Sequence, residues 1–272
     1  MHSGCVKRDF RRGIDHLTAN KPLISVICCA HNEEDYIDKS LPPLLKALEC
    51  FPSEVLFVAD RCTDRTAEFA RKYDVTVIEK TWKNWKNSYA ETLQTGYLRA
   101  KGKYVSIIDA DIAVPVNFFK ALVPQLGGDV GSVAADVVTY PDTFWNRLYF
   151  AWEKTYSLAP LGKEPHGAAR LVLKSVMDKF GGFGDVPAPD TYLDMCLAKE
   201  GYKSVADLAV TTFHLRHLSP GKMVSGQVVS GRARYALGIS FTRTLGHSLL
   251  RVRPLILKGW IYERMRTKNS KN

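Results

Sequence analysis

The stretch SIIDADIAVP, residues 106–115, places an apolar run directly before two carboxylates, Asp109 and Asp111. A short apolar run of this kind is typical of a strand buried on both faces of a sheet. Carboxylates at alternate positions of an extended segment point the same way, so this pair repels itself unless a cation is bound there. Asp is also common in solvated loops at strand ends, and the rest of the chain has to decide between the two readings.

Short apolar runs alternate with helical patterns around this stretch. Strands are predicted at residues 22–30, 54–60, 75–80 and 103–111, and helices at residues 34–48, 63–73 and 88–100. Four such alternations predict an α/β fold, Rossmann-like, with a mostly parallel, doubly wound sheet flanked by helices.

Polar side chains follow three of these strands, at residues 30–33, 60–64 and 109–111. In doubly wound sheets, ligands bind beyond the carboxyl ends of the strands. Because three separate strands bring polar groups to one edge, a functional site is favoured over solvated loops.

The second half of the chain has a different pattern. Helices are predicted at residues 116–126 and 144–158, with a strand between them at residues 131–140. Residues 144–158 carry an aromatic stripe on one face, which is typical of a core face and also of a membrane interface. The members of this stripe are Trp145, Leu148, Tyr149, Trp152 and Tyr156. A helix predicted at residues 191–200 follows Asp190, which is either its N-cap or a catalytic group.

The composition predicts a globular protein in a reducing compartment. Of the 272 residues, 46% are hydrophobic, which is enough for a sizeable core. The six cysteines include the adjacent Cys28 and Cys29 and do not suggest a disulfide framework. The chain contains neither a secretory signal pattern nor 18 consecutive apolar residues, so we expect no membrane crossing by this chain.

The net charge of +10 is concentrated near the C-terminus. Residues 208–272 contain twelve Lys and Arg against Glu263 alone, a net charge of +11, which leaves about −1 for residues 1–207. Such a segment is expected to meet an anionic partner: ligand phosphates, a membrane surface or a nucleic acid. Its mixture of basic, aliphatic and aromatic residues is typical of amphipathic helices on anionic membranes, or of helices that cover a domain with a basic solvated face.

The order of the motifs resembles that of family 2 glycosyltransferases with a GT-A fold, relatives of dolichyl-phosphate mannosyl and glucosyl synthases and of the cellulose synthase catalytic domain. The matching motifs are ICCAHNEE at residues 27–34, ADRCTDRT at 59–66, DAD at 109–111 and the Pro189-Asp190 pair before Gly201-Tyr202. Pro189 departs from the family, where an acidic residue is common at this position. The resemblance implies an N-terminal extension at residues 1–21, a GT-A catalytic domain at residues 22–218 and basic amphipathic helices at residues 219–272.

The resemblance also implies roles for individual residues. The donor-binding residues that it implies are Ala30, Asn32, Glu33, Asp60, Lys86, Asp109 and Arg216, with Asp60 on the nucleotide base. The ligands that it implies for Mg²⁺ or Mn²⁺ are Asp111, Asp109 and His214, and Asp190 takes the position of the catalytic base. His214 and Arg216 share a face in an extended segment, and the alternative for them is a solvated strand face.

The chemistry of glycosyl transfer explains these residue types. A leaving diphosphate needs cationic stabilisation, and a hydroxyl acceptor needs a base, whereas an already ionised lipid phosphate needs none. In that second case Asp190 positions the substrate or caps its helix. A single carboxylate opposite the diphosphate gives inversion, which we expect of Asp190.

We therefore predict a metal-dependent inverting glycosyltransferase that uses a nucleotide-diphosphate sugar, with GDP-mannose slightly favoured over UDP-glucose. The expected acceptor is a lipid-linked sugar or a polyprenyl phosphate. The expected location is the cytoplasmic face of a membrane, reached peripherally or through an anchor outside this chain.

Two other classes are less consistent with the sequence. A nucleotidyltransferase needs a glycine-rich basic loop after the first strand, whereas AHNEED, residues 30–35, is acidic and lacks glycine. A nucleic-acid-binding module could use the basic tail, but the tail has no zinc-ligand spacing and no aromatic RNA-binding motif, so no nucleic-acid partner is expected.

Overall fold

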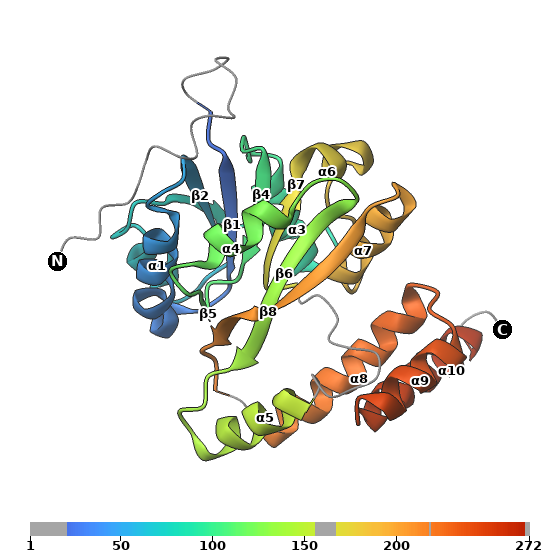
Figure 1. The fold of residues 1–272 in the computed structure, drawn as a ribbon. Coiled ribbons are helices and arrows are strands. Elements are labelled where there is room, and N and C mark those ends of the chain that lie inside the picture. The colour runs from blue at the N-terminus through green and yellow to red at the C-terminus, as the bar shows by residue number, and fades with distance from the viewer. Residues whose placement is uncertain (1–20, 156–166, 218, 270–272) are drawn as a thin grey trace.

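A computed structural model describes residues 21–155, 167–217 and 219–269, and its sheet has eight strands in the order β3-β2-β1-β4-β7-β6-β8-β5 (Figure 1). The strands are β1 (Ile24–Ala30), β2 (Ser53–Asp60), β3 (Thr76–Lys80), β4 (Tyr104–Ile108), β5 (Ile112–Ala113), β6 (Val130–Thr139), β7 (Ala169–Leu173) and β8 (Lys203–His214). The described helices are α1 (Glu34–Leu48), α2 (Thr66–Ala70), α3 (Ser88–Tyr97), α4 (Phe118–Leu122), η2 (Val123–Gln125), α5 (Phe144–Lys154), α6 (Lys174–Phe180), α7 (Pro189–Lys199), α8 (Pro220–Ala236), α9 (Phe241–Leu250) and α10 (Pro254–Asn269).

The first half of the sheet is parallel, as predicted. Strands β3, β2, β1 and β4 pair side by side in the same direction. The second half is mixed, because β7 runs antiparallel to both β4 and β6 while β8 runs parallel to β6. The predicted α/β class is confirmed, whereas β7 was not expected from the sequence.

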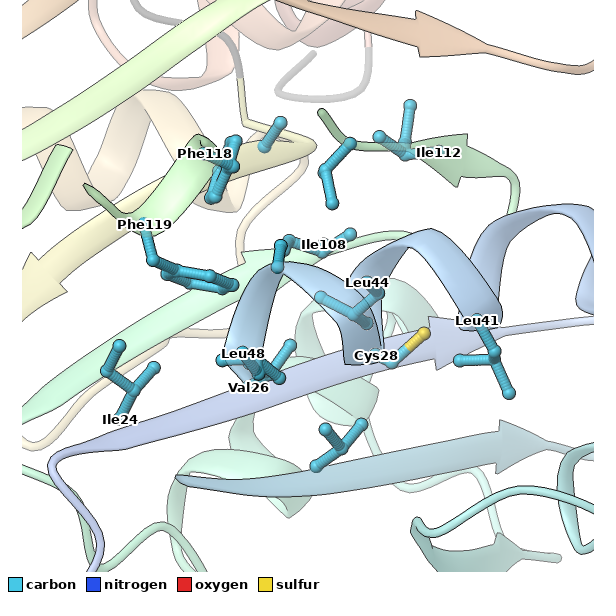
Figure 2. Packing of buried hydrophobic residues seen from close by; sticks show 14 of the residues in the cluster. Ile24, Val26, Cys28, Leu41, Leu44, Leu48, Ile108, Ile112, Phe118 and Phe119 are labelled. Atoms are coloured by element: carbon cyan, nitrogen blue, oxygen red, sulfur yellow. The ribbon is translucent and has the colours of Figure 1, made fainter. Parts of the chain in front are cut away.

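Strand β1 is buried on both faces, which explains its continuous apolar run. Its residues alternate between two hydrophobic clusters, with Val26 and Cys28 on one side and Ile27 and Cys29 on the other. On the first side, Leu44 and neighbouring leucines of α1 face the strand (Figure 2). The second cluster lies under α3, α6 and α7, so helices cover both faces of the sheet.

The C-terminal helices α8, α9 and α10 pack together at the lower right of Figure 1. Two glycines allow α8 and α10 to approach closely, because a Cβ at Gly231 would overlap the carbonyl oxygen of Ile256, and one at Gly259 that of Val228. Helix α10 buries Trp260 and exposes basic residues, but its apolar residues do not keep to one face as the predicted amphipathic pattern requires. It also exposes apolar side chains, namely Ile261, Tyr262 and Met265.

The aromatic stripe of α5 is more exposed than a core face would be. Trp145 is 49% exposed and Leu148 is 50% exposed, so a core role is wrong for these two residues. Tyr149 and Trp152 are half-buried, and Tyr156 lies outside the described residues.

Among the helices of the described residues, none combines the length and the apolar character needed to span a bilayer.

Cysteine pairing differs from the expectation at one position. Cys28, Cys29, Cys62 and Cys196 are free thiols, whereas Cys50 takes part in a disulfide.

Candidate functional site

The carboxyl ends of β1 and β2 are joined by side chains of the loops that follow them. The carboxamide oxygen of Asn32 accepts a hydrogen bond of 2.8 Å from the amide of Thr63, and the amide of Glu33 donates to the hydroxyl of Thr66 at 2.7 Å. Asn32 and Arg61 both adopt left-handed backbone angles, with φ of 57° and 47°. Such non-glycine residues are uncommon and concentrate at functional sites.

Asp60, at the end of β2, lies at the centre of a buried polar network. Its carboxylate accepts hydrogen bonds from Lys80 Nζ at 2.9 Å, Ser88 Oγ at 2.6 Å and Arg61 Nε at 3.0 Å. Burial opposes ionisation of Asp60, but the hydrogen bonds from Arg61, Ser88 and Lys80 outweigh it and lower its pKa to about 2. Asp60 is therefore a fixed anion at the predicted base-binding position.

Lys80 was missed by the sequence reasoning. Its side chain is fully buried at the end of β3, and its Nζ lies 2.9 Å from Asp60 Oδ1 and 3.0 Å from Glu91 Oε2. Lys80 is the last residue of β3, and polar residues at the carboxyl ends of parallel strands meet at one edge of a sheet. Its position at a strand end could therefore have indicated that it belongs to the site.

The two carboxylates of the DAD motif do not point to the same place. Strand β4 ends at Ile108, and the amide of Ile112 donates to the carbonyl oxygen of Asp109 at 3.0 Å, which closes a turn. Asp109 accepts a hydrogen bond of 2.9 Å from the hydroxyl of Tyr89, whereas Asp111 contacts His214 and Arg216. The predicted extended arrangement of Asp109 and Asp111 is wrong because this segment turns, but the two carboxylates still repel each other: burial, followed by the charge of Asp111, raises the pKa of Asp109 to about 8.

Asp111 and His214 meet because the short strand β5 pairs with the end of β8. Ile112 is opposite His214 in this antiparallel pair, and the amide of Leu215 donates to the carbonyl oxygen of Asp111 at 2.8 Å. His214 Nε2 consequently lies 3.2 Å from Asp111 Oδ2. Burial lowers the pKa of His214, although the charge of Asp111 opposes this, and a neutral imidazole is the form that binds metals.

Arg216 joins the first strand end to this pair. Its Nε lies 3.0 Å from Asp111 Oδ2, and its guanidinium also pairs with Glu33. Burial, followed by the charge of Asp111, raises the pKa of Glu33 to about 7 although Arg216 opposes the shift. Three of the predicted residues, Glu33, Asp111 and Arg216, are thus in direct contact.

The donor set at Asp111 fits a hard divalent cation in part. Asp111 is 2% exposed, and its Oδ2 makes no well-formed hydrogen bond despite the nearby nitrogens of His214 and Arg216. Across the described residues, no three His, Cys, Asp or Glu side chains converge on one point. Asp111 and His214 would therefore supply two ligands to a bound ion, and Mg²⁺ in proteins commonly takes its remaining ligands from substrate phosphates and water. Asp109, the third predicted ligand, instead bonds Tyr89.

A cavity of 530 Å³ joins Asp109 to Asp190. Helix α7 begins at Pro189 and its N-cap is Ala188, so Asp190 lies in the first turn and the N-cap reading of this residue is wrong. Gly167 closely faces Asp190, because a Cβ there would lie 2.8 Å from the Asp190 Cβ. The side chain of Asp190 is consequently available to the cavity.

Strand β7 holds α7 in place through a second feature that sequence reasoning missed. Arg170 is fully buried, and its Nη2 lies 3.0 Å from Oδ1 of Asp194, one helical turn after Asp190. Burial raises the pKa of Asp194, although Arg170 opposes it. No motif indicated this pair, because Arg170 stands in a strand that the sequence did not predict.

Ala30 and Lys86 complete the predicted donor-binding residues. Ala30 is buried at the end of β1 and accepts a weak hydrogen bond from Cys62 Sγ at 3.7 Å. The side chain of Lys86 is exposed, and its amide donates to Asp185 at 3.0 Å. Asp185 also accepts from the amide of Asn87, so the loop before α3 is tied to the loop before α7.

The sequence family follows from a match that covers more than half of the chain. The model of glycosyl transferase family 2 matches residues 25–174. The chain belongs to glycosyl transferase family 2. The predicted family is confirmed, and the matched residues contain the loops that carry Asn32, Asp60 and Asp109.

Two curated relatives resemble part of this family 2 chain. A Mycoplasma pneumoniae protein named uncharacterized glycosyltransferase MG025 homolog is 32% identical over 116 residues, 40% of this chain and 38% of the relative. An uncharacterized glycosyltransferase of Haemophilus influenzae is 30% identical over 112 residues, 39% of this chain and 33% of the relative. The match therefore spans under two fifths of either relative.

Solved structures share the fold of this family 2 chain. The mannosyltransferase PcManGT from Pyrobaculum calidifontis, in complex with GDP-Man and Mn²⁺, has a TM-score of 0.61 at 22% identity over 89% of this chain and 70% of its own. Glucosyl-3-phosphoglycerate synthase from Mycobacterium tuberculosis, in complex with Mn²⁺, UDP-glucose and phosphoglyceric acid, has a TM-score of 0.53 at 18% identity over 80% of this chain and 81% of its own. These likenesses confirm the predicted GT-A fold.

Proposed function

We propose that this protein transfers a hexose from a nucleoside-diphosphate sugar to an acceptor hydroxyl with inversion at the anomeric carbon. The observation that carries the proposal is the cavity shared by Asp109 and Asp190, next to the contact of Asp111 with His214 and Arg216. The carboxylate of Asp190 at the cavity wall and a pair near the strand ends that would bind a cation are the two parts that this reaction needs.

The donor is proposed to lie across the carboxyl ends of β1, β2 and β4. Asp60 and Asn32 would bind the nucleoside, and Arg216 would bind the diphosphate. Ala30 and Glu33 line the same strand end, and Lys86 stands at the exposed rim. Of the two structural neighbours described above, the one with the higher TM-score holds GDP-Man and the other UDP-glucose, which supports testing both, with GDP-mannose expected.

Asp111 and His214 would hold the Mg²⁺ or Mn²⁺ ion. When bound, the ion would neutralise charge on the leaving diphosphate. Arg216 would add a second positive charge at the diphosphate, and its contacts with Asp111 and Glu33 hold the guanidinium in position before the donor arrives.

In the proposed step, the acceptor oxygen forms a bond to the anomeric carbon from the side of Asp190. The bond between that carbon and the diphosphate oxygen breaks, and the nucleoside diphosphate leaves with the bonding electrons. The hydroxyl proton moves to the carboxylate of Asp190, which acts as the general base. Attack from the side opposite the leaving group gives inversion.

Peripheral contact with an anionic membrane surface is a further part of the proposal, and it suits a lipid-linked acceptor. Helix α5 exposes Phe144, which is 69% exposed, together with Trp145 and Leu148. Exposed aromatic and basic side chains are typical of helices at a lipid interface. Co-sedimentation with vesicles that contain an anionic phospholipid should fall when Phe144 and Leu148 are both replaced by Ser. Equal sedimentation of the wild type and the double variant would refute the proposed membrane contact.

A donor screen tests the proposed function. GDP-mannose and UDP-glucose are each incubated with the protein and Mg²⁺, Mn²⁺ or EDTA, and binding and slow hydrolysis of the donor are measured. We expect one sugar nucleotide to bind and hydrolyse only when a metal is present. Absence of binding by both donors in both metals would refute the proposal.

A further inference from the structure

The cavity that contains Asp190 has a second wall of opposite charge. Its lining includes Asp109 and Asp190 from the sheet side, and Arg234, Arg251 and Arg253 from the C-terminal helices. The basic residues of the C-terminal segment therefore do not all face outward. Arg232 and Arg266, by contrast, pair with Glu263, with Arg232 Nε 2.7 Å from Glu263 Oε2.

Helix α8 leaves room in front of these arginines. The residues that it turns toward the cavity include Gly226, Ser230 and Ala233, which are four and three positions apart and so share one face. Their small side chains keep the helix from filling the space, while Arg234 follows directly on the same wall.

The segment after α9 is built to present two further arginines. Val252, between Arg251 and Arg253, has a φ of 51°, a backbone conformation rarely adopted by a β-branched residue. Two hydrogen bonds hold it there. The amide of Arg253 donates to the carbonyl oxygen of Ser248 at 2.9 Å, and the hydroxyl of Ser248 donates to the carbonyl oxygen of Arg253 at 2.9 Å. Val252 itself is 67% exposed, so its side chain gains no burial from this conformation.

An acidic residue of α5 lies on the same wall as these arginines. Glu153 of α5 also lines the cavity, and its Oε2 accepts a hydrogen bond of 2.7 Å from the amide of Thr139. Arg253 lies near Glu153 and stacks over the ring of Trp152 at 5.8 Å from its centroid. Among the described residues, the lining at this end of the cavity thus has three guanidinium groups and one carboxylate.

We propose that the arginine end of the cavity, formed by Arg234, Arg251 and Arg253, binds a phosphate group of the acceptor. The acceptor hydroxyl then lies toward Asp190, at the carboxylate end. Guanidinium groups match phosphate oxygens through paired hydrogen bonds, and three of them suit a dianionic monoester. This inference rests on the proposed glycosyl transfer, and it names the class of acceptor: a hydroxyl compound that carries a phosphate.

The test uses inorganic phosphate as the probe, titrated by calorimetry into the metal-free protein in the presence of EDTA. Arg253→Gln and Arg234→Gln should each weaken phosphate binding by about tenfold or more, as expected for a lost charge-assisted contact. Arg243→Gln, which removes an exposed charge from α9, is the matched control and should bind phosphate as the wild type does. Circular dichroism checks that each variant is folded, and Arg253→Lys offers a milder change at the same position.

Asp111→Asn separates this site from the donor site. We expect it to bind phosphate as the wild type does. The inference is overturned if the wild type does not bind phosphate at millimolar concentration, if both arginine variants bind it unchanged, or if only Asp111→Asn affects binding. Binding of a sugar nucleotide with Mn²⁺ is measured on the same proteins. Failure of the proposed donor site can then be distinguished from failure of the proposed phosphate site.

The source of the phosphate is distinguished by two further titrants. Glycerol 3-phosphate represents a soluble phosphomonoester, and vesicles of phosphatidylcholine with phosphatidic acid represent a lipid phosphate. Arg253→Gln should weaken binding of the titrant whose phosphate resembles that of the natural acceptor. Arg243→Gln should weaken binding of neither titrant. If Arg253→Gln weakens binding of neither titrant, the inference is wrong.

Discussion

Asp109, directly after β4, and Asp190, in the first turn of α7, line one cavity although one follows a strand and the other begins a helix far along the chain. The antiparallel strand β7 makes this possible, because it pairs with β4 and anchors α7 through the contact of Arg170 with Asp194. The donor end and the proposed base are thereby fixed to adjacent strands.

Lys80 is predicted to be a major determinant of stability. Lys80→Met would leave the carboxylates of Asp60 and Glu91 buried without their shared cation, and should lower the free energy of unfolding by about 3–5 kcal/mol. Urea denaturation measures this change. Arg71→Met removes a surface partner of Glu79, with both side chains more than half exposed, and should cost no more than about 1 kcal/mol. Equal effects of the two substitutions would contradict the prediction.

The Asp60 network predicts a specific dependence of stability on pH. The pKa of Asp60 is about 2 in the folded protein, below an unfolded value of about 3.9. The contribution of Asp60, roughly 2 kcal/mol, is therefore present above about pH 4 and is lost as the pH falls through the folded pKa. Asp60→Asn should be less stable than the wild type at pH 7, and the difference should shrink toward pH 2. Asp74→Asn, at an exposed position, should show no such trend.

The close contact of α8 with α10 predicts opposite effects of two glycine substitutions. Gly231→Ala should lower the melting temperature, because its methyl group would overlap the backbone of Ile256, at a cost of about 1–3 kcal/mol. Gly246→Ala in α9 meets open space and should stabilise the helix by about 0.5–1 kcal/mol. Melting curves followed by circular dichroism decide the matter, and a stabilised Gly231→Ala variant would refute the described packing.

The proposed metal-binding pair, Asp111 and His214, predicts which substitutions remove the metal dependence of donor binding. Loss of a supporting residue around a metal typically costs roughly 10–100-fold in affinity, and loss of a direct ligand should cost at least as much. Asp111→Asn and His214→Ala should therefore each weaken Mn²⁺-dependent donor binding at least tenfold, as calorimetry with and without EDTA would show. His217→Ala, three residues further along, is the control. A Mn²⁺ effect that survives in Asp111→Asn would exclude this pair as the metal site.

The sequence predicted the parallel half of the fold chiefly because β1, β2 and β4 are largely buried and read as nearly continuous apolar runs. The helix predicted at residues 34–48 coincides with α1 for the same reason, since Ile37, Leu41 and Leu44 recur at helical spacing on one buried face. Strand β7 escaped prediction because it contains the buried Arg170, whose partner Asp194 lies far along the chain.

The predicted site residues were largely the residues that the structure brings together, but their pairing was not predictable. The contact of Asp111 with His214 depends on the two-residue strand β5, whose partner β8 is distant in sequence. The side chain of Asp109 was expected to point the same way as that of Asp111. The turn at residues 109–112 instead gives the two side chains different hydrogen-bonding partners. The arginines of the C-terminal helices were expected to meet ligand phosphates, a membrane surface or a nucleic acid, because composition alone does not show which of them turn inward.

The role of Asp190 is the central claim, and the transfer rate of Asp190→Asn tests it most directly. With the donor found in the screen and a hydroxyl acceptor, we predict a loss of about 10²–10⁴-fold in kcat, with donor affinity unchanged. Glu200→Gln, which removes a carboxylate just after the other end of α7, should transfer at the wild-type rate. Transfer by Asp190→Asn at the wild-type rate would contradict the account.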